Sequence, residues 1–399
     1  MLGSFDLNKT YQYLLIFLAF LMPLTVAGAN TIIVIICMLW LFSGDYKAKY
    51  IQIMSSKLMI ASIVFYCFHV IGLFWTEDIK WGLHILHKMW YFLLLFPILF
   101  NIVQRKYIKY YLIGFLLAIA LTEIVSYLVW FEIIAPFKNA TVDNPTPFMS
   151  HISYNPILVF AIYIVLHEIF LNKKLTHLVF SLYSFFAICM IINMFITGGR
   201  GGQVAFLVML LILIFQILDN QRIKSLIASF IMIPGIFFVA YQTSDLFQER
   251  FDRGLIEAIN FSNTSNNSVG LRINFVVNSF EVIKQNPIIG VGTGDFPTEY
   301  HKINLVNSPT LPSTSNPHNM FILILMQLGL IGLFSMLTIF YYQLKFLNTS
   351  SNKLMRNAAV TLPLIFLVLM LSDSYLLGHF TTLLFVFFSS FLYKNFEED

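Results

Sequence analysis

The sequence predicts an all-α integral membrane protein that crosses the bilayer many times. Of its 399 residues, 58% are hydrophobic and 11% are charged, and the mean hydropathy is +0.78. This composition is typical of polytopic membrane proteins. The apolar residues are grouped in spans, most of them near the roughly 17 to 25 residues that cross a bilayer. One long hydrophilic segment, residues 242–317, interrupts them.

Twelve apolar spans are predicted to be membrane helices. Lys9, the first span and a small-residue stretch at 27–29 imitate a signal peptide. The span is longer than a signal core and another follows at once, so we expect a retained first helix. The second span is short and is predicted to form a tight hairpin with the first. The spans cover residues 11–27, 30–42, 58–75, 85–102, 110–133, 156–170, 178–196, 203–218, 226–241, 320–342, 358–371 and 375–391.

The basic residues predict which helix ends face the cytoplasm. With the N-terminus inside, 15 of the 24 Lys and Arg residues lie on the inner side, and only Lys80, Lys138 and Arg200 lie in short outer loops. Short cytoplasmic loops are enriched in Lys and Arg, so both chain ends are predicted inside. The chain then divides into nine membrane helices (1–241), an outer loop (242–317) and three further membrane helices (318–399).

Two stretches of the outer loop have the pattern of short amphipathic helices. The first is residues 244–260, with Ser244 as its expected cap. The second is residues 268–285, with Ser268 or Asn267 as its cap.

Beyond these helices, Gly290, Gly292 and Gly294 are expected to form a turn-rich segment. It resembles a fragment of a dinucleotide-binding loop, but it follows no strand and opens no helix. It also faces away from cytoplasmic nucleotides, so we exclude that function.

Arg200 lies in a glycine-rich turn, Thr-Gly-Gly-Arg-Gly-Gly, between two spans on the predicted outer side. A guanidinium is always charged and can hold an anionic headgroup, and the glycines let a ligand approach the backbone. The following helix points its positive end outward, which also favours an anion. We therefore predict that Arg200, with Gly199 and Gly201, contacts substrate. A snorkelling arginine beside a flexible turn is the alternative.

His318 is the best single candidate for a general base. Asn316 is predicted to cap a helix, Pro317 to take its first position, and His318 to fall in its first turn. A helix N-terminus disfavours imidazolium, so this histidine is expected to stay neutral and accept a proton at pH 7. A histidine that only hydrogen-bonds at a helix start is the alternative.

Three other charged residues are less distinctive. Arg272, on the second loop helix, is typical of a solvated surface charge unless the loop folds over Arg200. Lys88 lies inside an apolar span, where a cation indicates function, although it is near enough to the outer end to snorkel. Asp373 lies in a short outer turn, where water can solvate it.

Metal and disulfide chemistry are not predicted. No pair or trio of outer carboxylates has the spacing of metal ligands, so we expect no metal and no cofactor. Cys37, Cys67 and Cys189 all fall inside apolar runs, which implies neither a disulfide framework nor a zinc site. Arginines can instead neutralise a leaving diphosphate without a metal.

Three features resemble the bacterial O-antigen ligase and polymerase superfamily. The first is an arginine in a glycine-rich outer turn between mid-chain helices, at residues 197–202. The second is the long outer loop, in which Arg272 precedes the sequence Asn-Pro-Ile-Ile-Gly-Val-Gly at 286–292. The third is the pattern His-Asn-x9-Gly-x-x-Gly that begins at His318 and is similar to the ligase signature. The twelve-span layout extends the resemblance over nearly the whole chain.

The resemblance implies an inverting, metal-independent transferase of the membrane glycosyltransferase (GT-C) type in the bacterial inner membrane, with its active site on the periplasmic face. Its donor would be a glycan on undecaprenyl diphosphate, and its acceptor a sugar hydroxyl on the lipid A core. Membrane lipid surrounds it, and no nucleic-acid partner is expected.

The resemblance also implies roles for individual residues. His318 would activate the acceptor hydroxyl, while Arg200 and Arg272 would bind the diphosphate and stabilise its departing charge. Lys88 would correspond to a basic residue near the donor, and Asn319 would contact substrate. Family members often have a serine just before the first arginine, where this chain has Gly199.

Other functions stay open at this point. An O-antigen polymerase or a protein O-oligosaccharyltransferase would have the same superfamily features. A transporter of lipid-linked glycans is ranked last, because transporters place broken helices and charges near the bilayer midplane, often in repeated halves. Here the distinctive residues gather at one predicted face.

Overall fold

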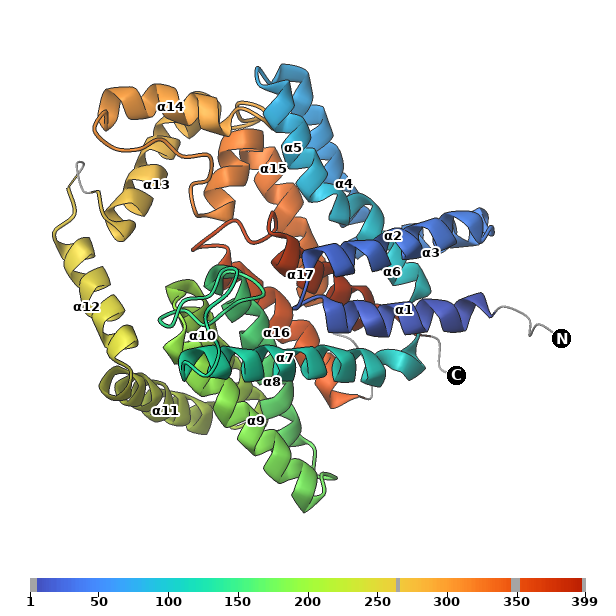
Figure 1. The fold of residues 1–399 in the computed structure, drawn as a ribbon. Coiled ribbons are helices and arrows are strands. Elements are labelled where there is room, and N and C mark those ends of the chain that lie inside the picture. Colours follow the sequence, from blue (N-terminus) through green and yellow to red (C-terminus); the bar gives the residue numbers. More distant parts are fainter. Residues whose placement is uncertain (1–5, 263–265, 346–351, 397–399) are drawn as a thin grey trace.

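The fold is helical throughout the described chain. The computed structural model describes residues 6–262, 266–345 and 352–396, and within these ranges the regular elements are all helices, with one isolated bridge between Thr141 and Asn144 (Figure 1). In chain order they are α1 (Leu7–Leu21), α2 (Val26–Phe42), α3 (Tyr46–Ser55), α4 (Lys57–Ile71), η1 (Gly72–Trp75), α5 (Ile79–Trp90), η2 (Tyr91–Leu95), α6 (Phe96–Ile102), η3 (Arg105–Tyr107), α7 (Ile108–Trp130), α8 (His151–Leu171), α9 (His177–Ile196), α10 (Arg200–Ile217), α11 (Arg222–Thr243), α12 (Asp245–Ile259), α13 (Ser268–Gln285), α14 (Phe296–Asn307), α15 (Met320–Lys345), α16 (Lys353–Leu369) and α17 (His379–Leu392).

Within the described ranges, eight helical segments are long and apolar enough to cross a membrane. The pair α2 and α3, bent by 116°, is a ninth candidate if it forms one span. This arrangement is consistent with a polytopic membrane protein. All twelve predicted spans fall on helices, but α1, α16 and α17 have only 15, 17 and 14 residues, so the count of twelve stays a prediction. The eight are Lys57–Trp75, Ile79–Ile102, Arg105–Trp130, His151–Leu171, His177–Ile196, Arg200–Ile217, Arg222–Thr243 and Met320–Lys345.

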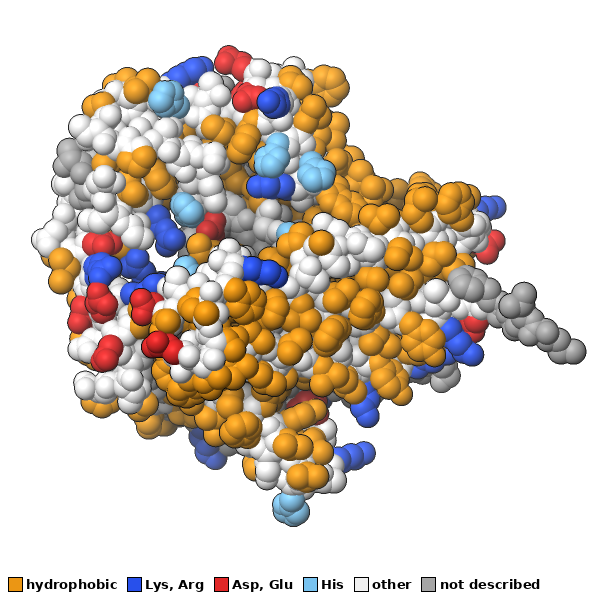
Figure 2. Space-filling view, in the orientation of Figure 1, with side chains coloured by type: hydrophobic (Ala, Val, Ile, Leu, Met, Phe, Trp, Pro, Cys, Tyr) orange, Lys and Arg blue, Asp and Glu red, His pale blue; other side chains and the backbone are white. Residues whose placement is uncertain are grey.

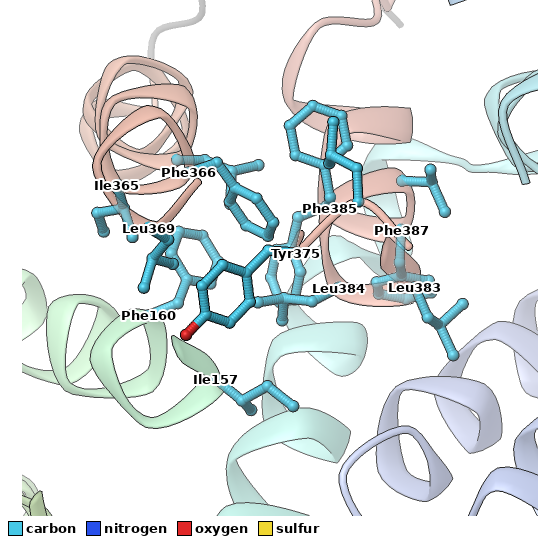
Figure 3. Close-up of a cluster of buried hydrophobic side chains, with 14 of the residues drawn as sticks. Ile157, Phe160, Ile365, Phe366, Leu369, Tyr375, Leu383, Leu384, Phe385 and Phe387 are labelled. Carbon is cyan, nitrogen blue, oxygen red and sulfur yellow. The ribbon is translucent and has the colours of Figure 1, made fainter. Parts of the chain in front are cut away.

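Helix α8 lies at the centre of the fold. Of the eight candidate spans it is the most buried, with 72% of its window inside the protein. It packs against α7, α9, α10, α16 and α17. Figure 3 shows aromatic and aliphatic side chains of α8, α16 and α17 meeting around Tyr375, with Phe160 and Phe366 among them. Because α8 is surrounded by protein, it can hold polar side chains at its outer end in fixed positions.

The hydrophilic loop folds into three helices, α12, α13 and α14. In Figure 1, α12 runs along one side of the molecule between α11 and α13, away from both chain ends. Ser244 caps α12 by accepting from the Phe247 amide, and Asn267 caps α13 by accepting from the Gly270 amide, as the sequence predicts. Helix α14 was not predicted; it begins at Phe296 with a proline in its first turn.

A kink in α15 joins the loop to the membrane helices. Gly329 has a φ of +61°, which interrupts the helical hydrogen bonds and frees backbone groups on both sides. The loop segment at 287–292 pairs with these groups. Val291 and Gly292 donate to the carbonyls of residues 326 and 327, while Leu330 and Ile331 donate to the carbonyls of residues 287 and 288, at 2.9–3.2 Å. Such pairing satisfies backbone groups that hydrocarbon could not.

The same segment also fastens to the turn between α4 and α5. The Asp295 carboxylate accepts from the amides of Glu77 and Asp78, at 2.8–3.0 Å. Thr293 donates from its amide to the Gly72 carbonyl and from its hydroxyl to the His69 carbonyl. The glycine-rich segment therefore links two membrane helices and fixes the start of α14.

Candidate active site

Arg200 begins α10 in a turn that α8 holds in place. Gly199 adopts a φ of +109°, which favours glycine, and lies directly before the helix. The Asn155 side chain of α8 donates to the Gly198 carbonyl at 2.7 Å and accepts from the Thr197 hydroxyl at 3.0 Å. Asn155 is fully buried, so the turn is anchored from below.

The glycines around Arg200 make room for other side chains of the protein. A side chain at Gly198 would collide with the guanidinium of Arg250 on α12, and one at Gly254 of α12 would collide with Arg200. Gly201 is approached in the same way by the hydroxyl of Ser372. The sequence predicts that these glycines admit a ligand to the backbone. In the structure, protein side chains lie in the spaces beside Gly198 and Gly201, and substrate contact at these glycines stays a prediction.

Arg200 and Arg272 line one small cavity of about 120 Å³, together with Arg250 and Asp373. Arg200 donates to the Ser268 hydroxyl at 3.2 Å. Within the described residues, Arg272 has no hydrogen-bond partner, so its five donors remain available. The remaining lining residues are His151, Ile152, Gly199, Gly201, Ser268, Ser372 and Tyr375.

This cavity is strongly positive. Three guanidinium groups line it, and Arg253 and Glu257 also act electrostatically on Arg200. The loop therefore folds over Arg200, which is the condition under which Arg272 was predicted to have a functional role. Figure 2 shows a hollowed face with Lys, Arg and His side chains gathered around it. A planar fork of donors matches phosphate oxygens in pairs, so this cavity is suited to a phosphorylated group.

His318 lies outside the helix that it was predicted to begin. Helix α15 starts at Met320, and the residue that caps it is Asn319, whose side chain accepts from the Ile322 amide at 3.1 Å. His318 has a φ of +52°, an uncommon conformation for a residue other than glycine. The predicted cause of its neutrality, the first turn of a helix, is therefore wrong.

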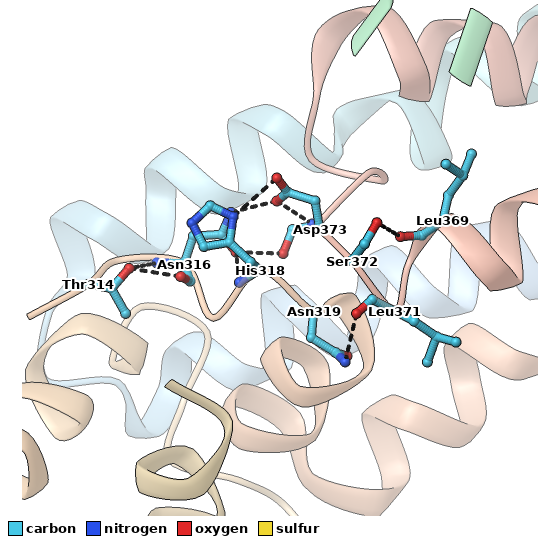
Figure 4. Close-up of polar contacts among 9 residues, drawn as sticks. Thr314, Asn316, His318, Asn319, Leu369, Leu371, Ser372 and Asp373 are labelled. Atoms are coloured by element: carbon cyan, nitrogen blue, oxygen red, sulfur yellow. Dashed lines mark hydrogen bonds and ion pairs between the residues drawn. The ribbon is translucent and has the colours of Figure 1, made fainter. Parts of the chain in front are cut away.

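The group that hydrogen-bonds the His318 ring is the Asp373 carboxylate, and not a helix N-terminus. This carboxylate lies 3.1 Å from Nδ1 of His318 (Figure 4). A carboxylate accepts from Nδ1–H, so in the neutral ring the proton sits on Nδ1 and Nε2 keeps its lone pair. The side chain of Asp373 is only 15% exposed, which corrects the interpretation that water solvates it.

Asn316 fixes both members of this pair. Its Nδ2 donates to Asp373 at 2.9 Å, and its Oδ1 accepts from the His318 amide at 3.0 Å and from the Ser374 hydroxyl at 2.8 Å. Burial alone would raise the pKa of Asp373. The hydrogen bond and charge of His318 outweigh burial, with help from the Ser374 amide and Asn316, and the pKa of Asp373 lies below its ordinary value.

Helix α13 connects the histidine with the arginines. Phe275 stacks on the His318 ring, with the ring centroids 6.1 Å apart, and it follows Arg272 by one helical turn. Asp373 provides a second connection between His318 and the arginines, because its carboxylate bonds His318 and also lines the arginine cavity. The arrangement places a histidine that can accept a proton beside a positive cavity that is suited to a phosphorylated group.

The other predicted site residues have different surroundings. Asn319 uses its side chain to cap α15 and to bond the Leu371 carbonyl, so both ends are engaged by protein. Lys88 lies half-buried in the last turn of α5 and does not line the arginine cavity. Within the described residues, no three His, Cys, Asp or Glu side chains form a group that could hold a metal ion.

Asp373 and Arg250 are the site residues that sequence reasoning missed. Asp373 stands in Leu-Ser-Asp-Ser-Tyr, a polar turn between two apolar spans on the same predicted face as His318. A carboxylate on the same predicted membrane face as a candidate general base indicates a partner that could orient that base. Arg250 carries no such signal, because it follows an ordinary amphipathic pattern.

Comparison with known proteins agrees with the resemblance in the sequence. Residues 185–337 match the family model described as O-antigen ligase, and this segment includes the Arg200 turn, α12 to α14 and His318. The resemblance to the O-antigen ligase superfamily is thus confirmed over that segment. An uncharacterised protein of Haemophilus influenzae is 29% identical over 224 residues, which cover 52% of this chain and 54% of the relative. The chain therefore spans about half the length of this curated relative.

Proposed function

We propose that the protein is an O-antigen ligase, which transfers a glycan from undecaprenyl diphosphate to a sugar hydroxyl of the lipid A core. One observation carries this proposal. Asp373 contacts His318 and also lines the cavity that holds Arg200 and Arg272. In this proposal, the carboxylate of Asp373 belongs both to the general base and to the site that binds the diphosphate. Both lie on the predicted periplasmic face of the inner membrane.

The proposed reaction is a single inverting displacement. Nε2 of His318 removes the proton of the acceptor hydroxyl as its oxygen attacks the anomeric carbon of the donor. The bond from that carbon to the phosphate oxygen breaks, and its electron pair leaves with the diphosphate. Asp373 holds Nδ1–H, keeps the ring in the required tautomer and stabilises the imidazolium that forms.

The arginines stabilise the leaving group in this mechanism. Charge grows on the diphosphate as the bond breaks, and donors already in position stabilise it more in the transition state than in the ground state. Arg272 has unused donors and Arg200 is partly held by Ser268, so the two can share the phosphate oxygens. No metal ion is assigned a role.

An apolar groove beside the cavity suits the lipid of the donor. This groove, of about 890 Å³, lies between α9 and α11 and reaches Ile196, three residues from Gly199 at the arginine cavity. In this proposal the polyprenyl chain lies in the groove and its diphosphate extends toward Arg200. The strained backbone of His318 is a further supporting observation, since strained residues cluster at active sites.

The lipopolysaccharide pattern of a deletion strain tests the ligase assignment. We expect loss of all O-antigen on the core, with lipid-linked polymer accumulating. Retention of a single repeat unit would indicate a polymerase, and a normal ladder on the gel would exclude both. Loss of glycan from a protein, with normal lipopolysaccharide, would indicate an oligosaccharyltransferase.

Chelation tests the metal-independent mechanism separately. We expect that EDTA leaves glycan transfer by the purified protein unchanged, because arginines neutralise the leaving diphosphate. Inhibition by EDTA that added Mg²⁺ or Mn²⁺ reverses would contradict it.

A further inference from the structure

A second large pocket lies at the opposite end of the bundle from the arginine cavity. Its volume is about 840 Å³, and the ends of α7, α8 and α16 surround it. Helix α8 reaches from His151 at the arginine cavity to Leu171 at this pocket, a length of about 30 Å for its 21 residues. By the predicted topology, the pocket opens at the cytoplasmic face.

The mouth of this pocket is basic. Among the residues that the structure describes, five basic side chains line it, against a single carboxylate, that of Glu168. Glu168 accepts from the Asn172 side chain at 2.7 Å. Within the described residues, no carboxylate lies at ion-pair distance from the four lysines. The five are Arg105, Lys106, Lys109, Lys174 and Lys353.

The helix ends add to this positive character. Helices α7 and α16 begin at the pocket, and a helix N-terminus favours an anion through its free amides and its dipole. Helix α8 ends there and opposes them. Two helix N-termini and the lysines favour an anion, while the C-terminus of α8 and Glu168 oppose it.

Below the basic mouth, the pocket wall is apolar. Lys109, Leu112, Ile113 and Leu116 stand at spacings of three and four residues, so they form one face of α7. This face begins with a charge and continues as hydrocarbon toward the bilayer. A phospholipid has the same order of charge and acyl chain.

His167 supplies an unpaired polar group in the wall. Its side chain is 2% exposed, and Nε2 contacts the Asn357 amide, but its buried Nδ1 has no partner within the described residues. A buried polar atom without a partner costs free energy, and a bound polar group would satisfy it.

We propose that this pocket binds an anionic phospholipid of the cytoplasmic leaflet. The phosphate lies among Lys109, Lys174 and Lys353, and an acyl chain follows Leu112 and Leu116 along α7. The site is independent of glycan transfer and would exist whatever the outer cavity binds. Basic pockets between membrane helices on the cytoplasmic side are suited to such headgroups.

Lipid titration followed by native mass spectrometry tests this proposal on the full chain in detergent. Phosphatidylglycerol is the anionic probe and phosphatidylethanolamine the zwitterionic one. We expect the double variant Lys109→Gln/Lys353→Gln to bind phosphatidylglycerol about 30-fold more weakly, because each lysine near an anionic headgroup strengthens binding about five- to sixfold and the two factors multiply. Its phosphatidylethanolamine binding should match that of the unaltered protein.

A matched control removes the same charge from the same predicted face. Lys47 and Lys224 are exposed and do not line the pocket, so Lys47→Gln/Lys224→Gln should leave phosphatidylglycerol binding unchanged. Equal weakening in both double variants would overturn the proposal, because the effect would then be one of net charge. Equal binding of the two lipids by the unaltered protein would also overturn it.

Glycerol phosphate distinguishes a lipid site from a free phosphate site. It carries the headgroup charge without acyl chains, so we expect it to compete poorly with phosphatidylglycerol. Competition at equal concentration would show that the apolar wall contributes nothing, and the lipid assignment would fail.

Discussion

Two glycine-rich segments on the same predicted face have different roles. Residues 197–202 surround Arg200 and line a charged cavity, with side chains of α8, α12 and the turn after α16 packed into the spaces beside the glycines. Residues 290–294 contribute backbone atoms instead, bonding the kink of α15 and the turn after α4. The first segment presents charge, and the second joins elements.

The difference shows how little glycine content alone says about ligand binding. At Gly290 and Gly329, a side chain would collide with backbone atoms of the other segment, so glycine is required for close approach. In the turn at 197–202, the guanidinium of Arg200 indicates function, and the glycines do not. The two segments should therefore respond differently to substitution, one through transfer and the other through stability.

Asp373→Asn should have the largest effect on transfer among these substitutions. An amide can donate to Nδ1 and stabilise the wrong tautomer, so we expect kcat to fall by roughly 10³–10⁴-fold, on the scale seen for Asp→Asn in the serine-protease triad. Purified donor and acceptor provide the assay. Asp219→Asn, an exposed aspartate just beyond the far end of α10, is the control and should behave normally. Equal activity in both variants would remove Asp373 from the mechanism.

Arg272→Ala should lower transfer by roughly 10²–10³-fold, the scale on which a single preorganised donor acts. The protein should still insert and unfold at its normal temperature, because Arg272 has no hydrogen-bond partner in the described chain. Lys284→Ala removes a positive charge from the exposed far end of the same helix and serves as the control. A matching loss in the control would assign the effect to net charge.

Gly329→Ala should act mainly on stability. The residue has a positive φ and faces the Ile288 backbone, so we expect the free energy of unfolding to fall by about 1–3 kcal/mol or more. Thermal unfolding in detergent measures it, with transfer expressed per folded molecule staying close to normal. Gly235→Ala in α11, where no atom lies within 4 Å of a new side chain, should not destabilise the protein. Unchanged stability of Gly329→Ala would contradict the role of the kink.

The smallest expected effect is one of pH on stability. Hydrogen bonds hold the pKa of Asp373 below its ordinary value, so its ionised form stabilises the fold. This contribution is fully present above the unfolded-state pKa of about 3.9 and is lost as pH falls through the lower folded-state pKa. The melting temperature should therefore decline more steeply below about pH 4 in the unaltered protein than in Asp373→Asn. Parallel curves would contradict the assigned pKa direction.

Local features of the fold could be predicted from the sequence. Apolar spans and caps depend on neighbouring residues, so the twelve apolar stretches fall on helices and Ser244 and Asn267 cap as expected. Helix α14 was missed because its composition is polar and its apolar periodicity is weak. Span lengths were less accurate, since α17 ends after 14 residues.

Contacts between residues far apart in the chain could not be predicted from the sequence. Arg200 and His318 were expected on one face, but the link through Asp373 joins residues 55 positions apart and depends on the packing of α15 and α16. The start of α15 was misplaced because Asn316 and Asn319 are both good caps. Asn316 binds His318 and Asp373 instead, and Asn319 caps the helix.

Glycan transfer by purified His318→Ala tests the central claim most directly. With purified donor and acceptor, we predict a loss of roughly 10²–10⁴-fold, the contribution of a positioned general base. His301→Ala, an exposed histidine on α14, should retain normal transfer. Near-normal transfer by correctly inserted His318→Ala would contradict the assignment of His318 as the base that Asp373 orients beside the diphosphate site.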